Sequence, residues 1–227
     1  MDSTREKIAL SWSSGKDSAL SFYYLNLQGY RISCLLTTIT IDYKRVSMHG
    51  VKEEIVDAQS ASLGIPLKKV YIPKGCVNKV YEEMMEKVCL ELKNEGIVKI
   101  AFGDIYLEDV RKYREENLKK INMYGLFPLW HKNSYFLARE FISLGFKAKL
   151  TCIDTKQLSR DFVGSEYDIN FLENLPTSCD PCGENGEFHT LVYDGPIFKI
   201  ALNITAGEKV LRDERFFYCD FLLNSNQ

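Results

Sequence analysis

The hydrophobic positions in the first half of the chain follow two alternating patterns. Short runs of β-branched and apolar residues predict buried strands, and apolar residues at helical spacing between them predict helices. The predicted strands cover residues 8–10, 32–40, 67–72 and 98–102, followed by a short apolar run at 126–129. The predicted helices cover residues 20–27, 51–63, 77–92 and 110–121. Strands that alternate with helices indicate βαβ units with right-handed crossovers and a parallel sheet.

The pattern changes near residue 130. Helices are predicted at 135–144 and 169–175, and strands at 146–153, 189–193, 197–202 and 216–222. The predicted fold class is therefore α/β, with a Rossmann-type parallel sheet over residues 1–130 and a smaller α+β domain over residues 131–227. The boundary, near residues 128–133, contains no Gly/Ser-rich or highly charged linker, so we expect the two halves to pack together.

Composition narrows the class of protein. The 227 residues carry a net charge of −2, which gives no general field for nucleic acid or a membrane surface. No leader peptide or apolar run of membrane-spanning length is present, and we predict a cytoplasmic protein. Seven cysteines, an odd number, suit reduced and mostly buried thiols. The single C-x-x-C pair, Cys179 and Cys182, is a weak signal for zinc, and buried thiols are the alternative.

Residues 13–18, between the first strand and the first helix, carry the first candidate site, and we name them the phosphate loop. A tight turn at a helix N-terminus directs free backbone N–H groups and the positive end of the helix dipole at one spot, which favours a phosphate. Lys16 adds a cation, Gly15 lets the backbone approach closely, and Ser13, Ser14 and Ser18 supply hydroxyl groups. The loop is not a Walker A motif, because Leu10 stands where that motif needs glycine. A serine-rich turn that caps an ordinary helix is the alternative.

Two further strand ends face the same edge of the predicted sheet. Residues Thr37 to Thr40 end the second strand, and Gly103-Asp104 ends the fourth. Because ligands bind at the carboxyl ends of parallel strands, we expect Thr38, Gly103 and Asp104 beside the phosphate loop, with Glu108 and Arg111 on the following helical turn. Helix capping by Asp104 and a solvated charged face are the alternative.

A polar turn in the second half is the third candidate. Its residues suit a turn that presents polar side chains: Cys182, Gly183, Glu184, Asn185, Gly186, Glu187 and His189. Carboxylates on such a loop bind an amine or act as a general base. His49 lies on the loop after the second strand and faces the same crevice. A surface hairpin with Asn185-Gly186 at its tip is the alternative.

Taken together, these segments resemble the diphthine–ammonia ligase family, the adenine nucleotide α-hydrolase-like branch of the PP-loop ATP pyrophosphatases. Ser13 to Ser18 is similar to the S-G-G-K-D-S signature, with Ser14 at the first glycine. Residues 103–105 and 183–187 match two further motifs, and Asn185 stands at the first glycine of the E-G-G-E element.

The resemblance implies a HUP-type fold, ATP and Mg²⁺ as cofactors, adenylation of a carboxylate with release of pyrophosphate, and amidation by ammonia. It implies catalytic roles for Lys16, Asp104, Glu184 and Glu187, and Asp17 as a metal ligand. The acceptor is a small molecule or a modified protein residue, and a homodimer is compatible with the sequence. Two other functions stay open: modification of a tRNA base or other nucleotide, and sensing of ATP or AMP without turnover.

Overall fold

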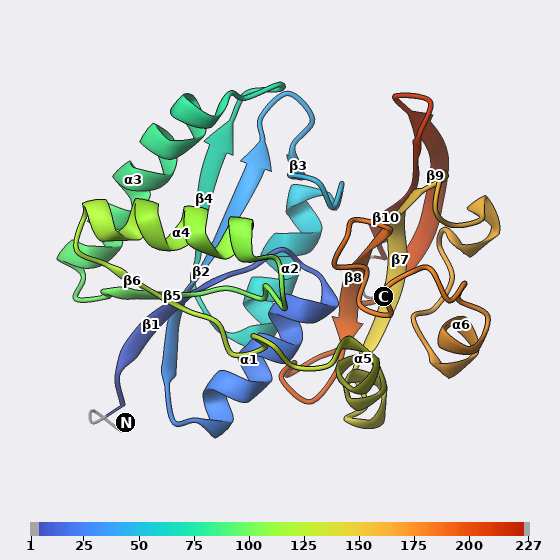
Figure 1. Cartoon of the computed structure of the whole chain (residues 1–227), viewed down its shortest axis with the longest axis horizontal. Coiled ribbons are helices and arrows are strands. Elements are labelled where there is room, and N and C mark those ends of the chain that lie inside the picture. Colours follow the sequence, from blue (N-terminus) through green and yellow to red (C-terminus); the bar gives the residue numbers. More distant parts are fainter. Residues whose placement is uncertain (1–4, 225–227) are drawn as a thin grey trace.

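The first half of the chain forms a mainly parallel sheet, as the pattern predicts (Figure 1). The computed structural model describes residues 5–224, so the first four and last three residues of the predicted domains lie outside it. The parallel strands lie in the order β4-β2-β1-β5-β6, and β3 pairs antiparallel with the end of β2. Their bounds are β1 (Lys7–Ser11), β2 (Arg31–Thr40), β3 (Arg45–Val46), β4 (Leu67–Ile72), β5 (Lys99–Ala101) and β6 (Tyr124–Leu126).

This strand order fixes where a ligand would bind. From β1 the chain proceeds outward through β2 to β4, then crosses back to β5 on the other side of β1. The topological switch point therefore lies between β1 and β5, and its crevice opens at their carboxyl ends. The phosphate loop follows β1 and Gly103-Asp104 follows β5, so the two predicted stretches flank this point.

Helices cover both faces of the parallel sheet. Alternate residues of β1 enter different cores: Ile8 and Leu10 pack with α1 (Lys16–Leu27) and α2 (Glu53–Leu63), and Ala9 packs with α3 (Asn78–Asn94) and α4 (Glu108–Lys120). The period-2 alternation of a strand produces this division. The short apolar run expected at 126–129 is shifted toward the N-terminus, since the strand β6 covers Tyr124–Leu126.

The second half forms a separate antiparallel sheet in the order β8-β7-β10-β9. Its elements are α5 (Ser134–Ser143), β7 (Lys147–Asp154), η1 (Arg160–Phe162), α6 (Ile169–Glu173), β8 (Phe188–Asp194), β9 (Ile204–Arg212) and β10 (Phe216–Leu223). The strand predicted at 197–202 was wrong, because that segment forms turns that cross the end of α2, where Lys199 N donates to Ser62 O. The strand β9, which begins two residues later and contains Gly207, was missed.

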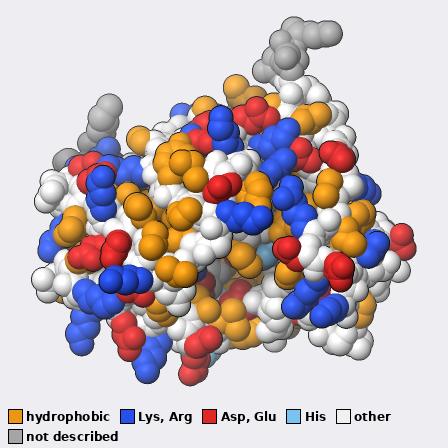
Figure 2. Space-filling view, turned by 90° about the horizontal axis from the view of Figure 1, so that it is seen from above, with side chains coloured by type: hydrophobic (Ala, Val, Ile, Leu, Met, Phe, Trp, Pro, Cys, Tyr) orange, Lys and Arg blue, Asp and Glu red, His pale blue; other side chains and the backbone are white. Residues whose placement is uncertain are grey.

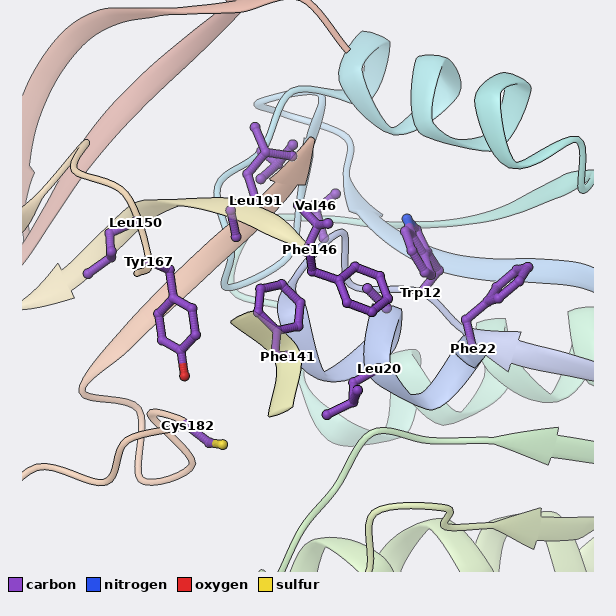
Figure 3. Packing of buried hydrophobic residues seen from close by; sticks show 14 of the residues in the cluster. Trp12, Leu20, Phe22, Val46, Phe141, Phe146, Leu150, Tyr167, Cys182 and Leu191 are labelled. Carbon is purple, nitrogen blue, oxygen red and sulfur yellow. The ribbon is translucent and has the colours of Figure 1, made fainter. Parts of the chain in front are cut away.

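The two halves pack directly against each other. One hydrophobic cluster contains Trp12 and Leu20 from the first half together with Phe141, Phe146 and Leu191 from the second (Figure 3). This continuous core confirms the expectation that the halves pack together without a flexible linker. In residues 5–224, no helix has the length and apolar character needed to cross a membrane.

Candidate functional site

The phosphate loop is anchored on the second sheet. Ser14 adopts a left-handed conformation with φ of 71°, and its carbonyl accepts from Val192 N at 2.9 Å and from Gln59 Nε2 at 3.1 Å. The backbone N–H of Lys16, at the first position of α1, donates to Thr190 Oγ1 at 3.0 Å. The edge strand β8 therefore holds the loop in place through contacts that are more than 170 residues distant in sequence.

The hydroxyl groups of the loop fit an anion cradle. Ser18 Oγ donates to Gly15 O at 2.8 Å, and Ser13 Oγ accepts from Gly15 N at 3.4 Å. Ser14 Oγ is buried and has no hydrogen-bond partner within residues 5–224. A Cβ on Gly15 would lie 3.0 Å from His49 Cε1 and 3.1 Å from Thr190 O, so only glycine fits without displacement. A buried hydroxyl without a partner costs free energy, which a bound phosphate oxygen would remove.

Lys16 joins the phosphate loop to the turn of residues 180–187, which we name the acidic turn. Its Nζ forms an ion pair with Asp17 at 2.8 Å and donates to the carbonyl of Cys182. The rings of Tyr167 and Phe188 lie 5.8 and 5.5 Å from the same atom. Burial lowers the pKa of Lys16, but Asp17, Cys182 and Glu184 together outweigh burial and raise it, so this side chain remains a cation.

The acidic turn holds its own shape through internal hydrogen bonds. The carboxylate of Glu187 is fully buried and accepts from Asp180 N at 2.8 Å, Asn185 N at 2.9 Å and Asn185 Nδ2 at 3.1 Å. Asp180 Oδ1 accepts in turn from Cys182 N at 2.8 Å. Glu187 therefore fixes the backbone of the turn, and no hydrogen bond or ion pair joins it to Lys16 within the described residues.

Glu184 is the carboxylate of the turn that reaches the switch point. Its Oε1 accepts from the consecutive backbone N–H groups of Ile105 at 2.8 Å and Tyr106 at 3.3 Å, just past β5. Burial raises the pKa of Glu184 to about 7, and the backbone donors only partly offset that effect. A carboxyl group with this pKa exchanges a proton near neutral pH, as a general base must.

The other residues predicted around β5 divide into two groups. Gly103 lies against the start of α1, since a Cβ there would lie 3.1 Å from the carbonyl carbon of Asp17. Asp104, however, accepts from Arg114 Nε at 2.7 Å and Arg114 Nη2 at 3.1 Å, and Arg111 pairs with Glu115. Asp104 does not cap α4, whose N-cap residue is Leu107, and no hydrogen bond or ion pair joins Asp104 or Arg111 to Lys16 or Glu184 within residues 5–224. Their predicted roles in the site stay predictions.

The remaining predicted residues lie at three places. Glu108 is exposed on the first turn of α4, and the carbonyl of Thr38 in β2 accepts from Ser47 N at 3.0 Å. His49 and His189 stack on each other beside the loop, with ring centroids 4.4 Å apart. Cys179 and Cys182 are free, buried thiols, and Gly183 and Gly186 take left-handed conformations at the bends of the turn.

Sequence reasoning missed two residues that position the loop. Gln59 is fully buried in α2, where it accepts from Trp12 Nε1 at 2.9 Å and donates to the carbonyls of Ser14 and Val192. Thr190 supplies the hydroxyl that Lys16 N donates to. A glutamine in the middle of an apolar helix face was the available signal for Gln59, because buried amides need partners.

Asp17 is the predicted magnesium ligand. Across the described residues, no group of three or more His, Cys, Asp or Glu side chains is arranged to hold a metal ion. Magnesium in nucleotide sites usually takes one or two carboxylates together with phosphate oxygens and waters, so a single carboxylate beside the loop fits that pattern.

A cleft of about 570 Å³ opens between the two halves, next to the loop that carries His49. Arg45, Met48 and Gly50 line one wall, and Arg212 and Tyr218 line the other. Figure 2 shows a hollow on one face of the molecule with a histidine side chain visible in it, whereas no histidine lines this cleft. Lys16 and the phosphate loop lie deeper and do not line the cleft.

Fold and site define an α/β protein in which a serine- and glycine-rich loop lies at the switch point of a parallel sheet and contacts an acidic turn that belongs to the second half of the chain. The family model of the diphthamide synthase N-terminal domain matches residues 6–124, and that of the diphthamide synthase C-terminal domain matches residues 133–221. The chain therefore belongs to the diphthamide synthase family.

Individual relatives agree with this assignment. The chain is 26% identical to the diphthine–ammonia ligase of Mus musculus and 25% identical to that of Homo sapiens, in each case over 93% of this chain and 87% of the relative. A solved U34-tRNA thiolase from Methanococcus maripaludis overlaps 62% of this chain and 58% of its own at 21% identity. Its TM-score of 0.37 is too low to bear on fold or activity.

Proposed function

We propose that the chain is an ATP-dependent, AMP-forming amide ligase that activates a carboxylate and joins ammonia to it. The family supports the ligase class, and its named relatives point to the carboxylate of diphthine, a modified protein residue, as the acceptor. The observation that carries the proposal is the contact between Lys16 Nζ and the Cys182 carbonyl, because it joins the phosphate loop to the acidic turn in one site.

The loop binds and polarises the triphosphate in this proposal. The positive end of the α1 dipole, the unpartnered hydroxyl of Ser14 and the cation of Lys16 all belong to the loop and the first turn of the helix that follows it. Preorganised donors of this kind contribute about 3 kcal/mol each to transition-state stabilisation. Bound Mg²⁺ would neutralise phosphate charge, and Asp17 would hold it after exchanging its ion pair with Lys16 for the metal.

Glu184 acts on the nitrogen donor. Its carboxylate lies at the switch point, where the activated carboxylate would form, and its pKa of about 7 lets it accept a proton from the attacking amine. Glu187 serves as a positioning residue, since its buried oxygens hold the turn that carries Glu184.

Three further properties belong to the proposal. They are a domain boundary near residue 130, a cytoplasmic location and a homodimer.

The nucleic-acid alternative finds little support on the surface. Three of the four basic residues of α4 that would contact RNA are paired with acidic neighbours: Arg114 with Asp104, Lys120 with Glu82 and Lys112 with Glu116. The fourth, Lys119, has no ion pair within residues 5–224. A surface of paired charges lacks the unneutralised cations that phosphate contacts need.

The test separates the products of ATP cleavage. Pyrophosphate and AMP are measured with Mg-ATP, ammonium and a panel of carboxylates that includes a diphthine-bearing protein. We expect Lys16→Ala to lower pyrophosphate release at least 100-fold, whereas Lys147→Ala, on an exposed ion pair, leaves it unchanged. Accumulation of ADP would contradict the assigned bond cleavage, and ATP binding without either product would favour the sensing module.

A further inference from the structure

Two imidazoles lie against the phosphate loop with no role yet assigned to them. The rings of His49, from the loop after β3, and His189, from β8, are 4.4 Å apart and tilted by 36°. The Cε1 of His49 lies 3.0 Å from where a Gly15 Cβ would stand, so this ring contacts the loop backbone directly. Two segments that are 140 residues apart therefore place a histidine pair beside the predicted phosphate position.

The ring nitrogens of the pair have almost no partners. His49 Nδ1 lies 3.5 Å from the carbonyl of Thr190, at the limit of a hydrogen bond, and no hydrogen bond to the His189 ring is found within residues 5–224. Both residues are only partly buried. Buried or half-buried polar groups normally find partners, so nitrogens left open beside an anion cradle suit an anionic ligand.

The electrostatics of the pair oppose protonation in the absence of a ligand. The cationic group that faces the rings is Lys16 from α1, and each imidazole also faces the other. Burial, His189 and Lys16 lower the pKa of His49, and burial and Lys16 lower the pKa of His189 to about 4. Both rings are therefore neutral at pH 7, and a polyphosphate beside them would reverse the sign of the local potential.

We propose that His49 and His189 form a second phosphate-contacting element of the site, and that nucleotide binding is coupled to proton uptake by this pair. The statement rests on the proposed function, since it takes the loop to be an ATP site. The proton comes from solvent, no bond is broken, and the protonated imidazole donates to a phosphate oxygen. Charge-assisted hydrogen bonds of this type are about twice as strong as neutral ones.

The experiment measures the protons taken up when an ATP analogue binds. Mg²⁺ with α,β-methylene ATP, which the chain cannot cleave between its α and β phosphates, is titrated calorimetrically in buffers of different ionisation enthalpy. We expect net uptake of about one proton at pH 6.5 and tighter binding at pH 6 than at pH 8. Ionisation of the nucleotide and of Glu184 also contributes to the measured proton uptake. The contribution of the histidine pair is therefore the difference in uptake between the unmodified protein and the variants.

The variants are His49→Gln and His189→Gln, with His131→Gln as the matched control because His131 is exposed and distant in sequence from both. The first two should lose most of the uptake and about tenfold in affinity at pH 6.5, and the control should lose neither. Imidazole ¹⁵N shifts of the unmodified protein give an independent measure, since the chain has only three histidines. Signals of His49 or His189 should move to the protonated form, and that of His131 should not.

Failure of the histidine inference can be told apart from failure of the proposed function. If the analogue binds while uptake is the same in all variants and the imidazole shifts stay neutral, the histidine pair is a packing contact and the inference is overturned. If the analogue does not bind the unmodified protein, the ATP site itself is wrong and the proposed function falls with it.

Discussion

The phosphate loop and the acidic turn meet at one lysine, yet they are stabilised in opposite ways. The loop depends on partners far away in sequence: Gln59, Thr190 and Val192 hold Ser14 and Lys16. The acidic turn is held mainly by its own residues, since Asp180 and Glu187 accept from N–H groups only two to seven positions away. A local motif can thus specify the shape of the turn but not the position of the loop.

The loop and the turn each have one residue that departs from the family signature, and these two residues differ in backbone strain. Ser14 stands where the signature has glycine, and it occupies a left-handed conformation that costs about 1 kcal/mol or more for a residue with a Cβ. Asn185 also replaces a glycine, but its φ is not positive, and its side chain adds a hydrogen bond to Glu187. The loop therefore retains strain that the turn avoids.

The largest expected effect comes from the distant support of the loop. Gln59→Leu removes three buried hydrogen bonds, from Trp12 Nε1 to Gln59 and from Gln59 to the carbonyls of Ser14 and Val192, and it leaves Trp12 Nε1 without this acceptor. We expect the free energy of unfolding to fall by about 3 kcal/mol, because each buried hydrogen bond contributes about 1 kcal/mol. Thermal unfolding measures it, and Gln28→Leu at an exposed position should change little. A loss equal to that of the control would refute long-range support of the loop.

A smaller loss is expected inside the turn. Glu187→Gln replaces an oxygen acceptor by an amide NH₂ that faces other N–H donors. Stability should fall by about 2 kcal/mol, and amide formation should fall with it because the turn carries Glu184. Hydrogen exchange at Asp180 and Asn185 locates the effect: protection lost there alone supports a self-contained turn, and protection lost at Lys16 as well would contradict it.

The pH dependence of amide formation distinguishes Glu184 from Glu187. The pKa of Glu184 is raised to about 7 by burial, and a general base must be deprotonated. The rate of amide formation should therefore fall about tenfold from pH 8 to pH 6, in addition to the fall caused by protonation of ammonia to ammonium. The variant Glu184→Gln lacks the base, so its lower rate should vary with pH only through the protonation of ammonia. Identical slopes in the two proteins would remove Glu184 from the proton-transfer step.

Hydrophobic periodicity was sufficient for the order of elements in the parallel sheet, because the central strands are buried and the helices between them contribute apolar side chains to the two cores. It failed at β9, where exposed residues such as Lys209 alternate weakly, and at residues 197–202, whose backbone bonds to Ser62 at the end of α2 and joins neither sheet. Motifs located Lys16 and Glu184. They could not locate Gln59 or Thr190, since the approach of β8 to the loop is a tertiary contact without a local signal.

A modest gain in stability is expected in the loop. Ser14→Gly relieves the left-handed strain and removes a buried hydroxyl without a partner. The unfolded chain gains entropy from glycine, so the net stabilisation should be about 1 kcal/mol, equivalent to about 2–4 °C in Tm. The same variant should bind the ATP analogue more weakly if that hydroxyl contacts phosphate. A drop in Tm would show that the backbone of the loop is not strained.

The smallest effect is expected at the corresponding position of the turn. Asn185→Gly removes the hydrogen bond from Nδ2 to Glu187 at an exposed residue and relieves no left-handed strain. Stability should fall by about 0.5 kcal/mol, opposite in sign to Ser14→Gly, and both are measured by denaturant unfolding in the same buffer. Because the two sites share no partner, the double variant should show the sum of the two changes within about 0.5 kcal/mol. A larger deviation would mean that the contact of Lys16 with Cys182 couples the loop and the turn mechanically, and the two regions would then have to be treated as one folded unit.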